Sequence, residues 1–285
     1  KKTSLIELKD DFKIYWESFP IAKLSPGKDY LKPEIYLIID DMVDSADRSN
    51  FAKFLQDWIN KKINFDLKSL TDLKNINTKN TSIRALAYQL YENNGVVKRD
   101  EVKYFLTKLG QEQRKILRKI GVKFGRYHIF LFKLFKPNAV SLRIALWKNF
   151  HQKYFDLKPP TFGLNFLNEK KGYSKDFMLL CGFEKFNNFF VRIDILERLF
   201  IKIMNLGNEN NKEKEIKLIP EMLNLLGCSK KDFLILIKNM NYLSYTKNDE
   251  TYFKYNYIKN NKKEFSPKVL KKENPFSILK NINFK

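Results

Sequence analysis

Residues 220–257 have the sequence PEMLNLLGCSKKDFLILIKNMNYLSYTKNDETYFKYNY, which carries the clearest signal of local structure in the chain. Pro220 suits the first turn of a helix, where the backbone N–H has no partner, and Gly227 suits its end. Ser229 and Asp232 have the spacing of a capping box, with Asp in place of the usual Glu, at the start of a second helix. The stretch therefore predicts two short helices joined by a tight turn.

A hairpin is expected after the second helix, because segments 242–245 and 251–257 can pair across a polar turn. Helix, turn, helix and hairpin is the order of a helix-turn-helix with a wing. In such a unit the second helix enters a nucleic-acid groove, which makes Lys230, Lys231 and Lys238 candidate contacts. The alternative is that this outline, common among small helical pairs, binds protein or no ligand at all.

Outward from this unit, apolar spacing and glycine breaks predict the remaining elements. Residues 12–39 alternate apolar and polar positions and favour strands, whereas residues 47–73 have one apolar face and favour a helix. Ser174 is a candidate N-cap for a short helix ending near Gly182. Residues 125–135 form either a strand or an irregular buried run. The other expected elements are helices at about 81–93, 99–109, 111–120, 138–156 and 194–204, and a hairpin at 183–193.

These elements predict a mainly α-helical fold with small β elements, an α+β class built as a multi-lobed helical region with a C-terminal helix-turn-helix or wing-like unit. The expected lobes are a charge-neutral β-containing lobe with a helix (1–78), a basic helical domain (79–160), a small hairpin–helix lobe (161–215), a winged-helix-like unit (216–258) and a disordered Lys/Asn-rich tail (259–285).

The formal net charge of +22 is unevenly distributed along the chain. Residues 1–78 are neutral and residues 161–215 carry +1, whereas residues 79–160 carry +13 and residues 216–285 carry +8. A composition bias alone would not leave two segments neutral and two strongly positive. The two basic regions therefore predict two electrostatic footprints for a polyanion.

The densest basic stretch lies between Arg114 and Lys136, which holds eight basic residues, no acidic one and several aromatic residues. Such a stretch can hold a phosphate backbone and offer flat faces for bases. The alternative is a solvated helix face beside an ordinary aromatic core. The predicted nucleic-acid contacts here are Arg114, Lys115, Arg118, Lys119, Lys123, Arg126, Tyr127, Lys133 and Lys136.

No catalytic constellation is recognisable. His128 and His151 match no zinc spacing with Cys181 or Cys228, and no G-x-S-x-G is present. The run 35–41 imitates a Walker B strand, but no G-x-x-x-x-G-K-[ST] exists in the 285 residues.

The acids Asp40, Asp41, Asp44 and Asp47 leave two interpretations open. They could hold a divalent metal of a nuclease, or they could be first-turn acids favoured by the positive end of a helix. We expect the second arrangement, with no metal and no cofactor in this chain.

Membrane and secretory classes are also disfavoured. No charge-free stretch is long enough to span a bilayer, and no apolar signal region opens the chain. Two cysteines in a chain of this length favour reduced thiols and a cytoplasmic location. Because the chain begins with Lys rather than Met, we expect it to be a piece of a longer protein.

Several motifs, taken together and in order, resemble the C-terminal half of alphaproteobacterial superfamily-2 helicases that are similar to the mitochondrial degradasome RNA helicase. The matching segments span nearly the whole chain and are LRKIGVKFGRYHIFLFKLFKP (117–137), LRIALW (142–147), LIIDDMVD (37–44), GFEK (182–185), FVRIDILERL (190–199), LLGCSKKDF (225–233) and NPFSILK (274–280).

The resemblance implies a piece of an ATP-dependent DExH-type helicase that unwinds RNA or DNA. It also implies that the motor, with its ATP and magnesium sites, lies upstream, because the family's catalytic motifs have no counterpart in these residues. The chain would then be an accessory region that contacts its own upstream helicase core.

We therefore predict binding of single-stranded or partly unwound nucleic acid, without ATP hydrolysis by this region. The alternative is a protein-interaction scaffold that docks an acidic or ribonucleoprotein partner, with residues 274–280 recruiting a protein. A metal-dependent nuclease is the third and least favoured class.

Overall fold

The computed structural model describes residues 5–38, 45–153, 155–170, 172–209 and 215–256. The predicted tail 259–285, the segment 274–280 and the acids Asp40, Asp41 and Asp44 lie outside these residues.

A four-stranded antiparallel sheet opens the described chain. Its strands pair in sequence order and are β1 (Ile6–Leu8), β2 (Lys13–Trp16), β3 (Phe19–Asp29) and β4 (Lys32–Leu37). Helix α1 (Ser45–Asp66) packs along β4 and buries Leu55, Ile59 and Ile63, which recur once per helical turn. The strands predicted within 12–39 are confirmed, and the helix predicted at 47–73 divides at Leu67 into α1 and α2 (Lys68–Lys74).

Residues 81–131 form a compact unit of three helices and a three-stranded antiparallel sheet, here called the 81–131 unit. Its elements are α3 (Thr81–Glu92), β5 (Val96–Lys98), α4 (Lys103–Thr107), α5 (Gln111–Ile120), β6 (Val122–Phe124) and β7 (His128–Leu131). The sheet order is β5-β7-β6, so the first strand pairs with the last. Residues 125–135, left open by the sequence, are divided between a turn, strand β7 and a 3-10 helix, η2 (Phe132–Phe135).

Residues 193–255, the 193–255 unit, repeat the same order of elements. They form α8 (Ile193–Glu209), β11 (Ile216–Lys217), α9 (Pro220–Leu226), α10 (Lys230–Asn239), β12 (Tyr242–Lys247) and β13 (Glu250–Tyr255). The sheet order β11-β13-β12 again pairs the first strand with the last. The Ser229 side chain accepts a hydrogen bond from the Asp232 N–H at the start of α10, which confirms the predicted cap.

Residues 137–192 lie between these two units and have a shorter version of the same plan. They form α6 (Pro137–His151), β8 (Phe166–Asn168), α7 (Lys175–Leu180), β9 (Phe183–Phe186) and β10 (Phe189–Arg192). Their sheet order is β8-β10-β9. The predicted Ser174 cap and the predicted 183–193 hairpin are both present.

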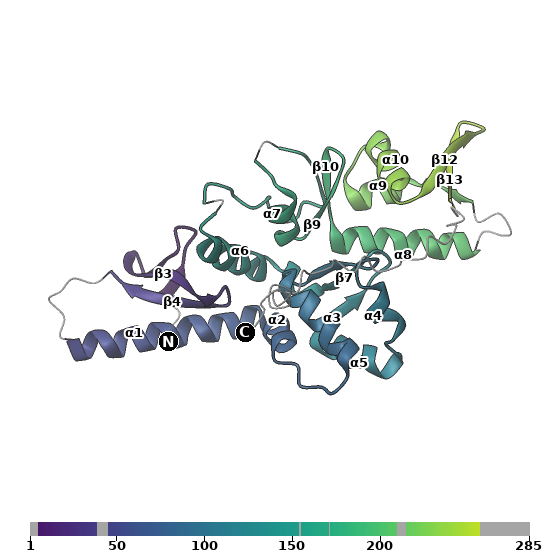
Figure 1. Ribbon diagram of the computed structural model, residues 1–285. Coiled ribbons are helices and arrows are strands. Elements are labelled where there is room, and N and C mark those ends of the chain that lie inside the picture. The colour runs from purple at the N-terminus through teal and green to yellow at the C-terminus, as the bar shows by residue number, and fades with distance from the viewer. Residues whose placement is uncertain (1–4, 39–44, 154, 171, 210–214, 257–285) are drawn as a thin grey trace, which may run out of the picture.

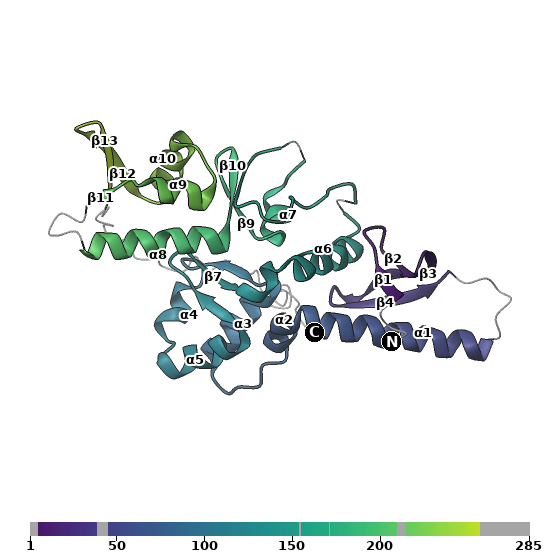
Figure 2. The same cartoon turned by 180° about the vertical axis from the view of Figure 1, so that it is seen from behind.

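The molecule is elongated, with the β1–β4 sheet and α1 at one end and the 193–255 unit at the other (Figures 1 and 2). One hydrophobic cluster extends from Ile6 on β1 to Leu146 on α6. A second cluster holds the 193–255 unit together and includes Phe200, Phe233 and Phe253. The short strands therefore lie in continuous cores rather than at the ends of separate helical lobes.

The predicted mainly α-helical, multi-lobed fold is wrong. The described residues are about 48% helical and 25% strand, with four small antiparallel sheets, so the fold is a mixed α+β fold. The sequence underestimated β structure because β5, β6, β8 and β11 are only two or three residues long. A period-two pattern cannot be recognised over so few positions, and only pairing with strands distant in sequence defines them.

Candidate nucleic-acid interface

Helix α5 displays part of the predicted basic stretch on the surface of the 81–131 unit. It begins after Gly110 and ends at Gly121, whose φ of 111° closes the helix in the left-handed region. Lys115, Arg118 and Lys119 are exposed. Arg118 and Lys119 lie in the last helical turn, where the partial negative charge of the helix end favours cations.

The adjoining strand β6 extends this surface. The guanidinium groups of Arg114 and Arg118 lie 5.9 and 5.5 Å from the centre of the Phe124 ring. Arg114 is half-buried and donates a 3.1 Å hydrogen bond to the Leu106 carbonyl, so it fixes α5 to α4. Lys123 is exposed next to Phe124. The structure thus places Lys115, Arg118 and Lys119 on one helix and Lys123 on the strand that follows it; we call these four exposed cations the α5–β6 surface.

The α5–β6 surface has little local compensation by acids. In the part of the chain that the structure describes, none of its four cations pairs with a carboxylate, although ion pairs occur elsewhere. Glu112, in the first turn of α5, is the nearest acid in sequence to this helix's cations. Four unpaired cations on one helix and the next strand repel one another and attract a polyanion.

The other predicted residues of the basic stretch lie elsewhere. Lys133 and Lys136 are exposed, but they follow strand β7, on η2 and just before α6. Tyr127 is half-buried: its ring meets Phe200 edge-on at 4.7 Å, and its hydroxyl donates to the Met240 carbonyl at 3.4 Å. Tyr127 therefore packs against the 193–255 unit and offers no free face for a base.

Arg126 also belongs to the contact between units. Its guanidinium lies 5.9 Å from the centre of the Tyr127 ring and 5.8 Å from that of Tyr255 on β13. Arg126 and Tyr127 thus connect the tip of the β6–β7 hairpin to the 193–255 unit, although Arg126, like Lys123 at the start of the same hairpin, is an exposed residue.

Helix α10 gives the 193–255 unit a second basic face. Lys230, Lys231 and Lys238 are all exposed on this helix, with Asp232 in its first turn. Helix α10 has the same place in its unit that α5 has in the 81–131 unit, as the second of two helices before the hairpin. The two predicted basic footprints therefore occupy equivalent elements of two repeated units.

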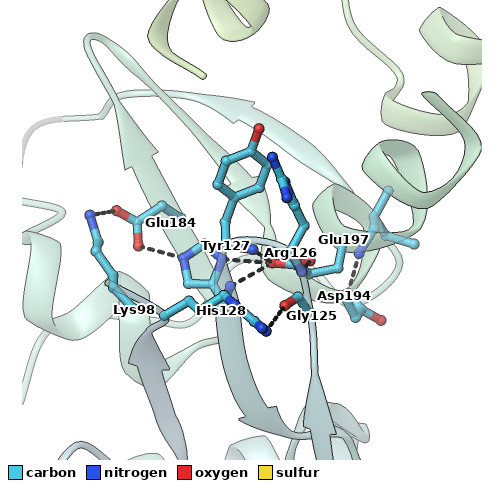
Figure 3. Close-up of polar contacts among 10 residues, drawn as sticks. Lys98, Gly125, Arg126, Tyr127, His128, Glu184, Asp194 and Glu197 are labelled. Carbon is cyan, nitrogen blue, oxygen red and sulfur yellow. Dashed lines mark hydrogen bonds and ion pairs between the residues drawn. The ribbon is translucent and has the colours of Figure 1, made fainter. Parts of the chain in front are cut away.

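A buried carboxylate joins these two units (Figure 3). Glu197 of α8 is 3% exposed, and its carboxylate accepts hydrogen bonds from three consecutive N–H groups, those of Arg126, Tyr127 (2.9 Å) and His128 (2.7 Å). A Cβ at Gly125 would lie 2.4 Å from this carboxylate, so glycine is required for the close approach. The turn between β6 and β7 is therefore built around a side chain 71 residues later in the chain.

His128 extends this contact into a charged cluster of Lys98, Glu184, His128 and Glu197, which we call the buried hub. The His128 Nδ1 lies 3.1 Å from Glu197, its Nε2 lies 3.4 Å from Glu184, and Lys98 pairs with Glu184 at 2.7 Å. Burial by itself lowers the pKa of His128, but hydrogen bonds to the two carboxylates outweigh it and raise the pKa above its ordinary value. Burial likewise opposes ionisation of Glu184, yet His128 and Lys98 lower its pKa.

Sequence reasoning missed the buried hub and part of the basic surface. The available signal for the hub was Glu197 in the middle of the apolar face of a helix, since a buried acid needs a partner.

The missed part of the basic surface lies on and next to α4. Tyr104 is 65% exposed, with the Lys108 ammonium 4.0 Å from its ring centre. Lys103 and Lys108 of α4 are further exposed cations of the same helix pair.

Comparisons with known proteins give no family: no family model, no curated protein and no solved structure matches the chain. Among the described residues, no helix is both long and apolar enough to cross a bilayer. A search of the same residues finds no group of three or more His, Cys, Asp or Glu side chains placed to hold a metal ion.

Proposed function

We propose that this chain binds single-stranded or partly unwound nucleic acid as an accessory C-terminal region of an ATP-dependent RNA or DNA helicase. The observation that carries the proposal is the α5–β6 surface: four exposed cations on helix α5 and on the first strand of the hairpin that follows it, unpaired with carboxylates in the described residues. A phosphate backbone supplies the anions that such a surface needs.

The repeated architecture favours a ligand that is long and carries many charges. Helix α10 presents Lys230, Lys231 and Lys238 at the equivalent place of the second unit. The buried hub fixes the β6–β7 hairpin to α8, and so holds the two units in one relative position. In both views α8 lies between α10 and α5 (Figures 1 and 2), so a nucleic acid that contacts both basic faces must be long enough to pass α8.

The proposal requires no ATP or magnesium site in this chain. The sequence contains no G-x-x-x-x-G-K-[ST] loop to cradle a triphosphate, and we derive no catalytic step here. In the proposal, ATP turnover belongs to an upstream helicase core, which this region contacts and to which it presents the bound strand.

The test is a comparison of two triple charge reversals of equal net charge. The first variant carries Lys115→Glu, Arg118→Glu and Lys119→Glu. The second carries reversals at three exposed lysines of the neutral N-terminal part, Lys23, Lys53 and Lys61. Both variants lose the same charge, so any difference reports on the place of the cations rather than on their number.

Binding to a fluorescently labelled single strand of RNA or DNA is measured by anisotropy at several salt concentrations. The slope of log affinity against log salt should fall by about 2 for the α5 variant, because each lost phosphate contact removes about 0.7 on a single strand. The control variant should lose affinity much less. Equal effects of the two variants would refute a local site, and no binding by the native chain at low salt would favour the scaffold that docks an acidic protein.

A further inference from the structure

A cavity of about 510 Å³ lies away from the α5–β6 surface, where four parts of the chain meet. Its walls come from the turn between β3 and β4, the C-terminal end of α3, the C-terminal end of α6, and helix α7. Figures 1 and 2 show α6 between the β1–β4 sheet and α7 in both views. Cavities of this size at the junction of several units are common positions for small ligands.

Aromatic rings dominate the apolar part of this cavity. Trp147 and His151 are adjacent, with ring centres 4.7 Å apart, and the rings of Tyr30 and Tyr91 lie 6.1 Å apart. Phe150 also lines the cavity. Burial and the nearby Lys153 lower the pKa of His151, so its ring is neutral at pH 7. Such rings favour a flat ligand.

The polar part of the cavity is rich in acceptors. Glu92 and Asp176 line it together with Asn93, all three exposed residues, and Lys28 is the one lysine among the lining residues that the structure describes. Carboxylates accept hydrogen bonds from N–H donors and repel phosphate. The lining therefore suits a flat ligand whose edge carries an amino group, rather than the phosphate of a nucleotide.

The walls are held in place from behind by other parts of the protein. The Tyr91 hydroxyl donates to both oxygens of Asp29, at 2.7 and 3.0 Å, and Lys74 pairs with the same carboxylate. Arg143 is completely buried and donates to the carbonyls of Asn94 and Leu180, two lining residues. A cavity whose walls are already fixed loses little conformational entropy on binding a ligand.

We propose that this cavity binds a nucleobase with an exocyclic amino group, as found in adenine, cytosine and guanine. This inference rests on the proposed function and deepens it, because it names the bases of the bound nucleic acid that would contact the protein at a second site. Uracil and thymine have no exocyclic amino group; each carries a carbonyl oxygen where cytosine carries its amine, and this oxygen would face the carboxylates. A free organic cation would also suit rings and acids, but the net charge of +22 disfavours its approach.

The experiment uses nucleosides, which carry no phosphate, with the full chain in isothermal titration calorimetry. Adenosine and cytidine should bind saturably, and uridine roughly tenfold more weakly, the discrimination expected of one well-made hydrogen-bonded pair. Asp176→Asn should weaken adenosine roughly tenfold, whereas Asp249→Asn, an exposed acid in the β12–β13 turn, should change nothing. Glu92→Gln is the second variant at the site, and circular dichroism checks that each variant is folded.

Equal affinities for uridine and cytidine, or no saturation by adenosine at millimolar concentration, would overturn the inference. So would an unchanged affinity for adenosine in both site variants, or displacement of adenosine by spermidine. The proposed function is tested separately, because nucleosides do not need the α5–β6 surface. If oligonucleotides bind with a steep salt dependence while nucleosides do not bind, the cavity assignment fails and the proposed function stands. If nucleosides bind and oligonucleotides do not, the proposed function fails and the cavity assignment stands.

Discussion

Removing the Glu197 carboxylate should be among the most damaging single changes in this protein. Its two oxygens accept the N–H groups of Arg126, Tyr127 and His128 and also contact the His128 ring; both contacts with His128 are buried and the other two are part-buried. A Glu197→Ala variant removes the acceptor of all these donors and leaves the His128 ring with Glu184 as its single acidic neighbour. Breaking a buried, hydrogen-bonded charge pair by removing one partner costs about 3–5 kcal/mol.

Glu197→Gln allows a finer estimate. Its amide keeps one acceptor oxygen, but its NH₂ group faces a donor and the charge is lost. Since a hydrogen bond to a charged group contributes about 1.5–3 kcal/mol, we expect a loss of about 2 kcal/mol for Gln and about 4 kcal/mol for Ala.

Urea unfolding followed by circular dichroism measures both losses, and hydrogen exchange at residues 126–128 locates them. The matched control is Glu221→Ala, an exposed acid in the first turn of α9, which should cost less than about 0.5 kcal/mol. If Glu197→Ala unfolds at the same urea concentration as Glu221→Ala, with protection at 126–128 unchanged, the buried hub does not hold the two units together as described.

Three further changes test other parts of the fold. Burial lowers the pKa of His128, but its hydrogen bonds to Glu184 and Glu197 outweigh burial and raise the pKa above its ordinary value of 6.5. The stabilisation by the charged ring is therefore complete below pH 6.5 and is lost as pH rises through the raised pKa. The stabilities of the native and His128→Gln proteins in urea unfolding should converge toward alkaline pH, and a constant difference between them contradicts this. Gly125→Ala places a Cβ 2.4 Å from the Glu197 carboxylate and should cost about 1–3 kcal/mol in thermal unfolding; an unchanged melting temperature would show that the turn yields freely. Ser229→Ala removes the cap of α10 and should cost about 1 kcal/mol, whereas Ser229→Asn should retain most of it; equal melting temperatures of the two variants would argue against the cap.

Many helices were predictable, because several carry their own start and stop signals. Ser174 and Ser229 cap α7 and α10 as the sequence indicates, and Gly121 and Gly227 end α5 and α9 in the left-handed region. The β content was underestimated for the opposite reason. Strands such as β5 and β11 have no signal of their own and exist through pairing with β7 and β13, far along the chain.

In the candidate site too, some features could be predicted from the sequence and others could not. The exposure of Lys115, Arg118 and Lys119 on α5 was predictable, because residues three or four positions apart on a helix share a face. The place of Tyr127 was not predictable, because its ring packs on Phe200, which lies on an element formed later in the chain.

By itself, the sequence determined the position of most helices and the concentration of positive charge on α5 and α10, because capping, helical periodicity and local charge act over a few neighbouring residues. Only the tertiary structure decided the repeated units, the aromatic cavity and the buried hub. These depend on pairs such as Glu197 with residues 126–128, about 70 positions apart, and local patterns hold no information about which distant groups a folded chain brings into contact.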